Sequence, residues 1–199
     1  MRTALTSCAI ALLLAVSACG SDESAGSGTE KTTPRALAAV LVDRIDETTR
    51  AEASEGVDYY GDGAVGATVR LAPETQVELV VGEHVPDELT SCAGDDAVRD
   101  GCAEIGDAVL TWQEEEPEED PGSITVAVPK GDGWAVATQS GTEVTSDPRR
   151  LDLDVSVDDM LALVRDDRVG LTTTSATIDA GDDVPNWRGP DKNPVYDDA

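Results

Sequence analysis

Apolar and polar residues alternate along several stretches in the middle of the chain, and this alternation restricts the fold more than any other feature. A period of two places successive side chains on opposite faces of a β-strand. In residues 75–82, for example, Val77, Leu79 and Val81 share one face. Strands with one apolar and one polar face are typical of an antiparallel sheet that is covered on one side only.

The best candidate for a β-hairpin covers residues 123–139. The apolar residues Ile124, Val126 and Val128 alternate along its first half, and a Pro-Lys-Gly-Asp-Gly turn follows. The second half alternates again, at Trp134, Val136 and Thr138. Two alternating runs joined by a glycine-containing turn predict two paired antiparallel strands.

Three further stretches have the same two-residue period. Residues 66–72 and 107–113 predict one strand each, and Pro73 separates the first of them from residues 75–82. Residues 151–157 alternate strictly, so they predict a strand with one face in water. The side chains expected to point inward there are Leu151, Leu153, Val155 and Val157.

Two stretches have the period of an amphipathic helix instead. The first stretch covers residues 34–56, where Pro34 suits the start of a helix and Gly56 its end. Its apolar residues Leu37, Val40, Leu41 and Ile45 recur at intervals of three and four. Its solvated face is expected to carry Asp43, Arg44, Glu47 and Arg50.

The second helix is expected to begin after Ser156. Ser156 is a natural N-cap, with Asp159 as the reciprocal partner three residues later. The apolar stripe of this helix would comprise Val157, Met160, Leu161 and Val164. A short helical turn is expected at residues 174–181, where Gly181 would end it.

This order of elements predicts a single α+β domain with an antiparallel sheet of about five to seven strands packed by two helices. We expect the domain to cover residues 35–185. Residues 1–18 are predicted to be a signal peptide, and residues 19–34, rich in Gly, Ser and Thr, a flexible tether. Residues 186–199 contain too much Pro and Asp for regular structure, so an irregular tail is expected.

An apolar run near the N-terminus stops at a cysteine. The run from Ala4 to Val16 is short for a membrane span of about 20 residues and fits the core of a signal peptide. It ends in Val16-Ser17-Ala18-Cys19, which resembles a bacterial lipobox. The resemblance implies cleavage before Cys19 and a diacylglycerol thioether on its sulfur. The alternative is an ordinary secretory signal in which Cys19 has no role.

The chain is strongly acidic, with 41 Asp and Glu against 14 Lys and Arg and a formal net charge of −27. Such a charge repels nucleic acids and anionic membrane surfaces, so we expect no nucleic-acid partner. Two interpretations of the charge stay open. It can serve solubility alone, or it can form a docking surface for a cationic protein or for divalent cations.

The chain contains four cysteines. Removal of the signal peptide takes Cys8 away, and the lipobox assigns Cys19 to a lipid. An even pair in an exported chain is expected to be oxidised, which predicts a disulfide between Cys92 and Cys102. A metal site is the alternative, but two cysteines without a nearby histidine offer too few soft ligands.

Residues that could carry catalysis are sparse. The only histidine, His84, is expected to be structural, and no motif for a serine nucleophile, a zinc protease or a phosphate-binding loop is present. Asp58 and Asp62 do not have the spacing of a calcium loop. The acidic run at residues 114–122 is expected to be a solvated hairpin loop, or else a weak cation patch. We therefore predict no catalytic residue, no metal ligand and no cofactor.

The three tryptophans remain as candidates for contacts. Trp112 and Trp134 lie within predicted strands, where we expect half-buried packing residues. Trp187, in the C-terminal tail, either docks the tail onto the domain or is an exposed contact residue together with Arg188.

The lipobox, the tether, the cysteine pair, residues 147–174 and the Trp-Arg-Gly at 187–189 together resemble small secreted lipoproteins of high-GC Gram-positive, actinobacterial-type bacteria. The resemblance implies a location on the outer face of the cell membrane, with the membrane as a partner through Cys19. We expect a non-catalytic binding or accessory module with a cationic protein or a cell-wall component as partner. Two alternatives stay open: an envelope hydrolase that uses paired carboxylates, and a lipoprotein that binds divalent cations.

Overall fold

Eight strands form the main sheet, in the order β10-β2-β3-β4-β8-β7-β6-β5. The computed structural model describes residues 29–71, 74–93, 99–116 and 120–190. All neighbouring strands of this sheet are antiparallel except β10 and β2, which are parallel. The strands are β2 (Arg50–Ala53), β3 (Val65–Arg70), β4 (Gln76–Gly82), β5 (Gly101–Ile105), β6 (Ala108–Gln113), β7 (Ser123–Lys130), β8 (Gly133–Ser140) and β10 (Trp187–Arg188).

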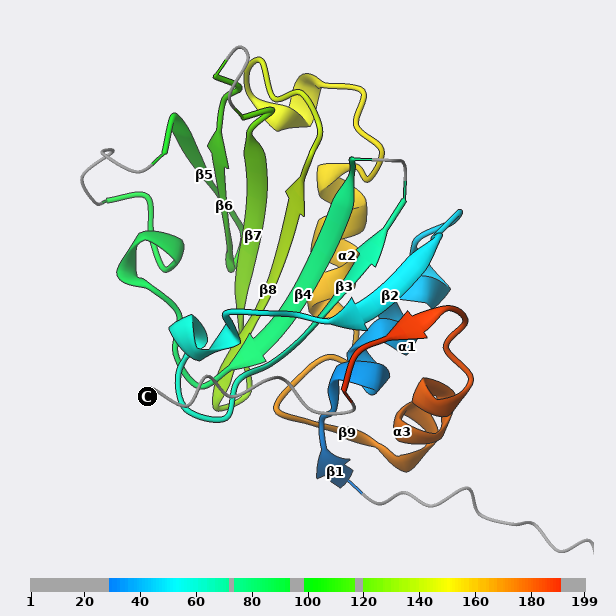
Figure 1. Cartoon of the computed structure of the whole chain (residues 1–199). Coiled ribbons are helices and arrows are strands. Elements are labelled where there is room, and N and C mark those ends of the chain that lie inside the picture. The colour runs from blue at the N-terminus through cyan, green and yellow to red at the C-terminus, as the bar shows by residue number, and fades with distance from the viewer. Residues whose placement is uncertain (1–28, 72–73, 94–98, 117–119, 191–199) are drawn as a thin grey trace, which may run out of the picture.

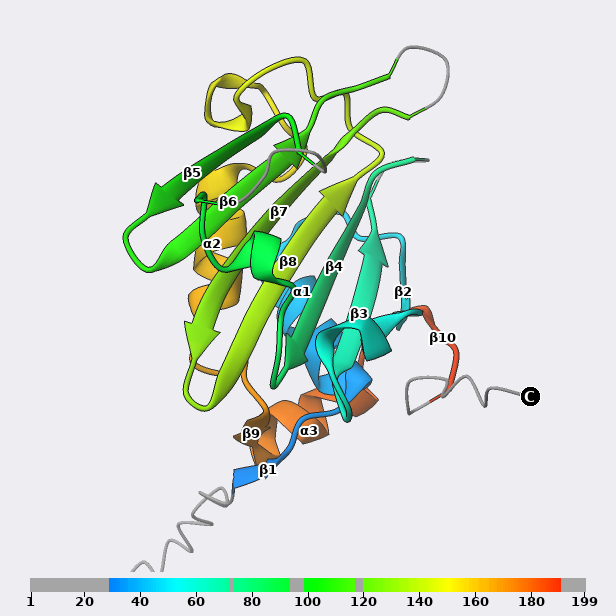
Figure 2. The ribbon, with the colours of Figure 1, turned by 90° about the vertical axis from the view of Figure 1, so that its left-hand side faces the viewer.

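Helices cover only one face of this sheet. Helix α1 (Pro34–Arg44) packs on β2, β3 and β4, and α2 (Val157–Arg165) packs on β7 and β8. Helix α3 (Ser175–Asp182) lies against α1, next to a small sheet of β1 (Thr29–Lys31) and β9 (Thr172–Thr174). Figures 1 and 2 show α1 and α2 on the same side, so among the described residues the opposite face of the sheet carries no α-helix, only two short 3₁₀ turns. The predicted α+β class with an antiparallel sheet is confirmed, with more strands and one more helix than expected.

The alternating residues of the strands form the core between the sheet and the helices. Val77, Leu79 and Val81 are buried as predicted, and the register places Leu79 between Ala67 of β3 and Ala137 of β8. The four apolar residues predicted for the first helix are also buried. The chain has no Phe, so aliphatic side chains fill most of this layer.

Strands β7 and β8 form the predicted hairpin. Its turn is shorter than the expected five residues, because Lys130 already pairs with Gly133 and only Gly131 and Asp132 lie between them. Gly131 has a φ of +60°, a conformation that glycine adopts without steric cost. Pro129 therefore lies within the strand, opposite Trp134.

The first helix is shorter than predicted. It ends at Arg44, and Ile45 is already extended, with a φ of −115°. Arg50 therefore does not lie on a solvated helix face but begins β2, in which Ala51 and Ala53 are buried. The helical period ends at Ile45, and beyond it only small alanines alternate, which is why the change to a strand is hard to see in the sequence.

Residues 151–157 do not form the predicted strand. Their burial does alternate, since Val155 and Val157 are buried while Asp152 and Asp154 are exposed. Among the described residues this segment has no strand partner; it connects the 3₁₀ turn Pro148–Arg150 to α2. The alternation reports which side chains reach the core, and it says nothing about backbone pairing.

The second helix is capped as predicted, whereas the third does not end where predicted. The backbone amide of Asp159 donates to Ser156 Oγ at 3.1 Å, and the Ser156 hydroxyl donates to the Asp159 carboxylate at 2.6 Å. The predicted stripe of α2 is buried. Gly181 lies inside α3 instead of ending it. Its lack of a side chain allows α3 to approach α1, because a Cβ there would come within 2.9 Å of the Arg35 carbonyl carbon.

Both ends of the folded part reach further than predicted. Thr29–Lys31 pairs with Thr172–Thr174, and Thr33 caps α1, so residues 29–34 of the expected tether belong to the domain. At the other end, Trp187–Arg188 adds a short strand beside β2, where an irregular tail was expected. The predicted signal peptide and Cys19 lie outside the described residues.

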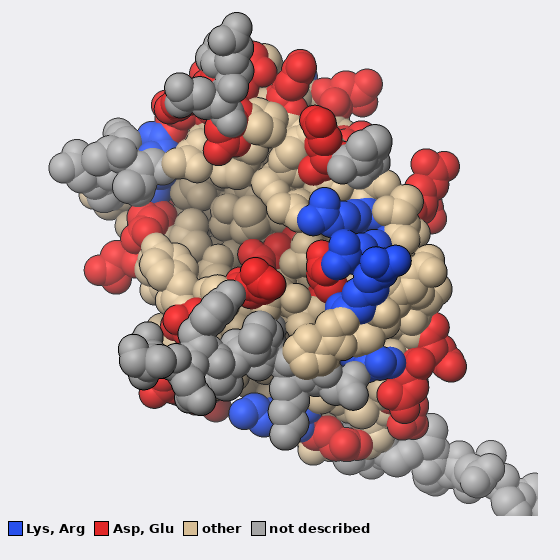
Figure 3. Space-filling model, in the orientation of Figure 1, with Lys and Arg blue, Asp and Glu red and all other residues tan. Residues whose placement is uncertain are grey.

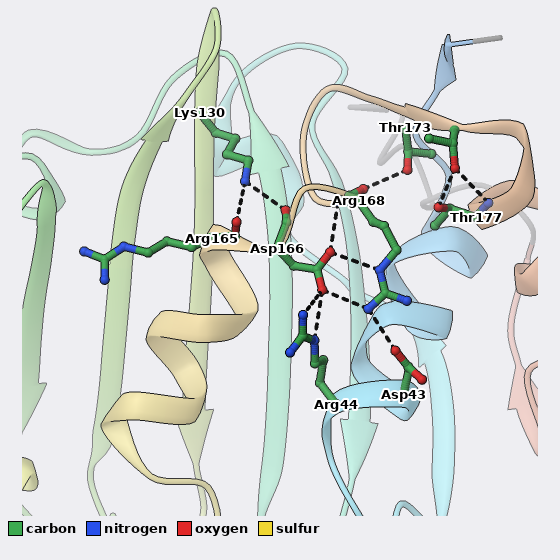
Figure 4. Close-up of polar contacts among 9 residues, drawn as sticks. Asp43, Arg44, Lys130, Arg165, Asp166, Arg168, Thr173 and Thr177 are labelled. Atoms are coloured by element: carbon green, nitrogen blue, oxygen red, sulfur yellow. Dashed lines mark hydrogen bonds and ion pairs between the residues drawn. The ribbon is translucent and has the colours of Figure 1, made fainter. Parts of the chain in front are cut away.

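A cluster of charged side chains joins the helices where α2 ends (Figure 4). The Asp166 carboxylate accepts hydrogen bonds from Arg44 of α1 and from Arg168. Arg168 also forms an ion pair with Asp43 at 2.9 Å. Lys130, at the end of β7, donates to the backbone carbonyls of Arg165 and Asp166 at 2.9 and 2.8 Å. This cluster fixes the helix layer and lies away from the uncovered face of the sheet.

Candidate ligand-binding face

The face of the main sheet that carries no helix presents mostly polar side chains. They alternate with the core residues along each strand, so the strand register identifies them. Glu52, Thr68, Glu78 and Thr138 form one row, because each lies opposite the next on β2, β3, β4 and β8. The neighbouring row is formed by Arg50, Arg70, Gln76 and Ser140.

Two hollows adjoin on this face. One, of about 460 Å³, lies over β2, β3, β4 and β8, and the other, of about 310 Å³, lies over β4, β8, β7 and β6. Glu78 and Thr138 line both hollows, which therefore form one continuous depression, called here the open-face trough. Figure 3 shows this face hollowed, with blue basic side chains gathered on one side of it.

Arginines gather at the β2 side of the trough. Arg50 and Arg70 lie opposite each other on β2 and β3, and both form ion pairs with Glu52, Arg70 at 3.8 Å. Arg188 of β10 pairs with Glu52 in the strand register, so its exposed side chain lies on the same face. We call Arg50, Arg70 and Arg188 the basic patch.

Glu78 lies in the middle of the trough, two strands away from Glu52. Burial raises the pKa of its carboxyl group, and a hydrogen bond from Ser54 opposes part of that rise. Thr68 and Thr138 flank it on the neighbouring strands. The trough floor therefore combines a partly desolvated carboxylate with several hydroxyl groups.

Two tyrosines form a wall of the trough. They come from the 3₁₀ turn Val57–Tyr60, which connects β2 to β3 in the chain and folds over β4. Burial and, secondly, the charge of Glu78 raise the pKa of Tyr60 to about 12. The turn packs closely on β4, because a Cβ at Gly82 would lie 2.4 Å from the Tyr60 carbonyl oxygen.

Tyr59 is the exposed member of this pair, with 62% of its surface accessible. Its ring lies edge-on to that of Tyr60, with centroids 5.5 Å apart. The Tyr59 hydroxyl donates to the Glu88 carboxylate at 2.7 Å, which raises the pKa of Tyr59. Glu88 belongs to the 3₁₀ turn Asp87–Leu89, which also lines the trough, next to Tyr59.

The predicted disulfide holds the segment that follows this second turn. The structure joins Cys92 to Cys102 with a Cα–Cα distance of 5.6 Å, which confirms the pairing and links the segment after Asp87–Leu89 to β5. Arg99 is buried and donates to the carbonyls of Glu88 and Ser91 at 2.7 and 3.2 Å. The position of Glu88 beside Tyr59 is therefore fixed covalently and by hydrogen bonds.

The structure separates the two residues that were named as contact candidates in the tail. Trp187 is half-buried against the core, and the Arg35 guanidinium lies 5.3 Å from its ring centroid. This packing supports the interpretation that Trp187 docks the tail. Arg188 is exposed on the open face. Trp112 and Trp134 are half-buried, as predicted.

The remaining candidates from the sequence do not form a site. His84 is exposed, and its backbone amide donates to the Tyr60 carbonyl at 3.3 Å. Residues Glu116 and Asp120 of the acidic run form an isolated bridge between β6 and β7. Within the described ranges, no three His, Cys, Asp or Glu side chains are placed to hold a metal ion.

Sequence reasoning did not single out Glu52, Arg70 or Glu78. Glu52 and Glu78 lie between buried residues of their strands, and Arg70 follows buried Val69 at the end of β3. That alternation is the one signal that places all three on the uncovered face. What the sequence lacks is the strand order. Without it, residues separated by as many as 138 positions along the chain, such as Arg50 and Arg188, cannot be assigned to the same patch.

A separate hollow of about 380 Å³ lies on the helix side, lined by Arg44, Leu71 and several acidic residues. It adjoins the Asp166 cluster and has no aromatic wall. Of the helices in the described part of the chain, none combines the length and apolar content needed to cross a bilayer. Comparison with protein-family models, curated proteins and solved structures finds no match for this chain.

Proposed function

We propose that this protein is a lipid-anchored, extracytoplasmic binding protein and that its ligand occupies the open-face trough. The observation that carries the proposal is the uncovered, hollowed face of the sheet, on which polar and aromatic side chains converge. Concave sites with a few convergent polar groups are the usual location of ligands in proteins. An uncovered sheet face without such a function would need only solvated side chains and no walls.

The sequence of the N-terminus supports the anchor. The Val16-Ser17-Ala18-Cys19 motif would give Cys19 a diacylglycerol group, and two acyl chains suffice for stable membrane attachment. The disulfide supports an oxidising compartment outside the cytoplasm. Between Cys19 and Thr29, nine residues would span at most about 30 Å, so the domain would stay close to the membrane surface.

An envelope hydrolase is the second candidate, and the position of Glu78 favours it. Glu52 and Glu78 face the same hollow across Thr68, which puts their Cα atoms about 10 Å apart. In glycoside hydrolases the two carboxyl groups lie about 5–10 Å apart and one has a raised pKa. The Cα separation of Glu52 and Glu78 is compatible with such a spacing of their carboxyl groups. Glu52, however, is held by Arg50 and Arg70, which favours a binding role over catalysis.

The anchor is tested by replacing Cys19 with Ala and fractionating cells. We expect the variant protein to leave the membrane fraction while the wild-type protein remains in it. Membrane retention of the variant would contradict the lipid anchor.

The binding role is tested by photo-crosslinking in the native envelope. A benzoylphenylalanine at position 59, in the trough wall, should give a discrete crosslinked product. The same residue at Asp158, exposed on α2, is the matched control and should not. Equal labelling from both positions, or none from position 59, would refute the assignment of the trough. Bond cleavage in the captured ligand that Glu78→Gln abolishes would instead support the hydrolase.

A further inference from the structure

We infer that the open-face trough binds an acidic carbohydrate, a chain rich in hydroxyl groups that carries a carboxylate or a phosphate. Its anionic group would lie on the basic patch and its hydroxyl groups over the trough floor. This inference rests on the proposed binding function and adds the chemical class of the ligand.

The basic patch is a local concentration of positive charge. Arg50, Arg70 and Arg188 lie around Glu52 on this edge of the sheet, while Glu55 and Glu78 also line the hollow. Three guanidinium groups therefore offset three carboxylates here, although the whole chain has 41 acidic and 14 basic side chains. An anionic ligand group is repelled less at this edge than elsewhere on a protein of net charge −27.

The arginines retain donors that a ligand could use. The Arg50 Nε atom is buried and has no hydrogen-bond partner among the described residues. The side chains of Arg50 and Arg70 are 37% and 41% exposed, so both can meet a ligand from solvent. Planar guanidinium groups bind carboxylate and phosphate with two parallel hydrogen bonds, and a buried donor without a partner gains most from such a bond.

The floor next to the patch suits hydroxyl groups. Gln76 and Ser140 continue the row of Arg50 and Arg70, and Gln76 donates to Ser140 Oγ at 3.1 Å. In the parallel row, Glu78 offers a strong acceptor that is partly withdrawn from water. A carboxylate here accepts hydrogen bonds from sugar hydroxyls and repels a second anion. The ligand would therefore lie with its anionic group toward β2.

Tyr59 supplies the apolar contact that a sugar ring needs. Most of the surface of this large side chain is exposed. Its hydroxyl group is held by the hydrogen bond to Glu88. An aromatic face held in place offers contact area with little loss of conformational entropy. Basic patch, hydroxyl floor and aromatic wall lie in sequence along one trough.

The net charge of the protein does not prevent this binding. At physiological ionic strength, charges more than about 8 Å from the ligand are largely screened. Contacts within the trough therefore decide the affinity, and these include the arginines.

The test measures binding by calorimetry with the full mature protein at physiological salt. The probes are tetragalacturonic acid, glucose 6-phosphate, the neutral sugar maltotetraose and inorganic phosphate. We expect binding of one or both acidic sugars, with inorganic phosphate and maltotetraose each at least about tenfold weaker. Preference for tetragalacturonic acid would identify a carboxylate ligand, and preference for glucose 6-phosphate a phosphate ligand.

Two variants and one control locate the site. Arg70→Gln and Arg188→Gln each remove a charge from the patch and should weaken binding by about tenfold to a hundredfold. Arg149→Gln is the matched control, because Arg149 is equally exposed and pairs with Asp147 outside the trough. Arg70 and Arg188 are both solvent-accessible, and an unchanged melting temperature would verify that the variants fold.

Three results would overturn the inference. The first is equal affinity for maltotetraose and the acidic sugars. The second is a loss of affinity in Arg149→Gln as large as that in Arg70→Gln and Arg188→Gln. The third is no binding of any sugar by a protein that does crosslink a ligand from position 59. The last result would leave the proposed binding function intact and reject only the ligand class. Failure of the crosslink itself would reject the proposed function.

Discussion

The Arg44 guanidinium donates two hydrogen bonds to one carboxylate oxygen of Asp166, at 2.9 and 2.6 Å, across 122 positions of the chain. The Asp166 side chain is only 5% exposed, and Arg168 binds both oxygens of the same carboxylate. Two guanidinium groups thus satisfy one buried anion, which joins α1 to the end of α2. Removal of that anion would leave two arginines without their shared partner.

Replacement of Asp166 by Asn should lower the free energy of unfolding by about 3 kcal/mol, because breaking a buried ion pair leaves uncompensated charge. Urea denaturation followed by circular dichroism measures the change. Asp107→Asn is the control, since Asp107 is 60% exposed and pairs with Arg165 on the surface. That variant should unfold at nearly the same urea concentration as the wild type, because solvent screens an exposed ion pair. Equal losses in the two variants would contradict the structural role given to Asp166.

The same cluster predicts how stability depends on acid. The hydrogen bonds from Arg168, with those from Arg44, hold the pKa of Asp166 well below its usual range. The unfolded chain therefore binds a proton at higher pH than the folded one. The contribution of Asp166 is complete above about pH 4 and is lost as pH falls further. In melting experiments from pH 7 to pH 2, Asp166→Asn should show a shallower decline than the wild type. Parallel curves would refute this assignment.

Reduction of the Cys92–Cys102 disulfide should lower the free energy of unfolding by about 2.5–3 kcal/mol, because it releases a closed loop of about eleven residues. Thermal melting with and without reductant measures the effect. The variant with both cysteines replaced by Ser is the control and should not respond to reductant. Since the bond also holds the wall with Glu88, reduction should weaken crosslinking from position 59. A wild-type melting temperature that does not respond to reductant would show that the bond adds no stability.

Replacement of Glu78 by Gln should raise the melting temperature at pH 7 by about 2–4 °C. Burial raises the pKa of Glu78, so the folded state holds its proton more tightly than the unfolded state. Wild-type stability therefore falls as pH rises through the ordinary glutamate value of about 4.3. The gain in the variant should vanish below pH 4, where both side chains are neutral. A lower melting temperature at pH 7 would contradict the desolvation of this carboxylate.

The hydroxyl of Tyr60 should remain protonated well beyond the ordinary tyrosine range. Its pKa is raised to about 12, primarily by burial and then by Glu78 and Tyr59. Absorbance at 295 nm, recorded against pH, should show a late ionisation step that is absent in Tyr60→Phe. Because the folded state binds the proton more tightly, this group lowers stability as pH rises above about 10. A late step that persists in the variant would assign it to another tyrosine.

Local patterns in the sequence predicted the parts of the fold that depend on neighbouring residues. The two-residue period located β3, β4, β6, β7 and β8, and the Ser156 cap located the start of α2. Each of these signals depends only on residues that are close together in the chain, because the local backbone geometry fixes which side chains share a face and which residue caps a helix. The disulfide was predicted from the expectation of export, which left Cys92 and Cys102 as partners for each other, and the structure pairs them.

The same side-chain patterns gave wrong predictions in two segments, because a pattern of burial does not show whether the backbone pairs with a neighbouring strand. Residues 151–157 alternate in burial without forming a strand, and Arg50–Ala53 forms a strand although its only apolar residues are alanines. In both segments, whether a strand forms depends on which other part of the chain lies alongside to form hydrogen bonds with its backbone. The pattern of side chains within the segment does not contain that information.

The sequence alone determined the class of fold, the aliphatic core and the acidic surface, since each follows from residue type and spacing along the chain. Only the tertiary structure decided that Arg50, Arg70 and Arg188 meet around Glu52, with Glu78 two strands away. The physical reason lies in the strand order. β10 joins the edge beside β2, and β8 lies between β4 and β7. Contacts between strands so far apart in the chain bring the candidate site together.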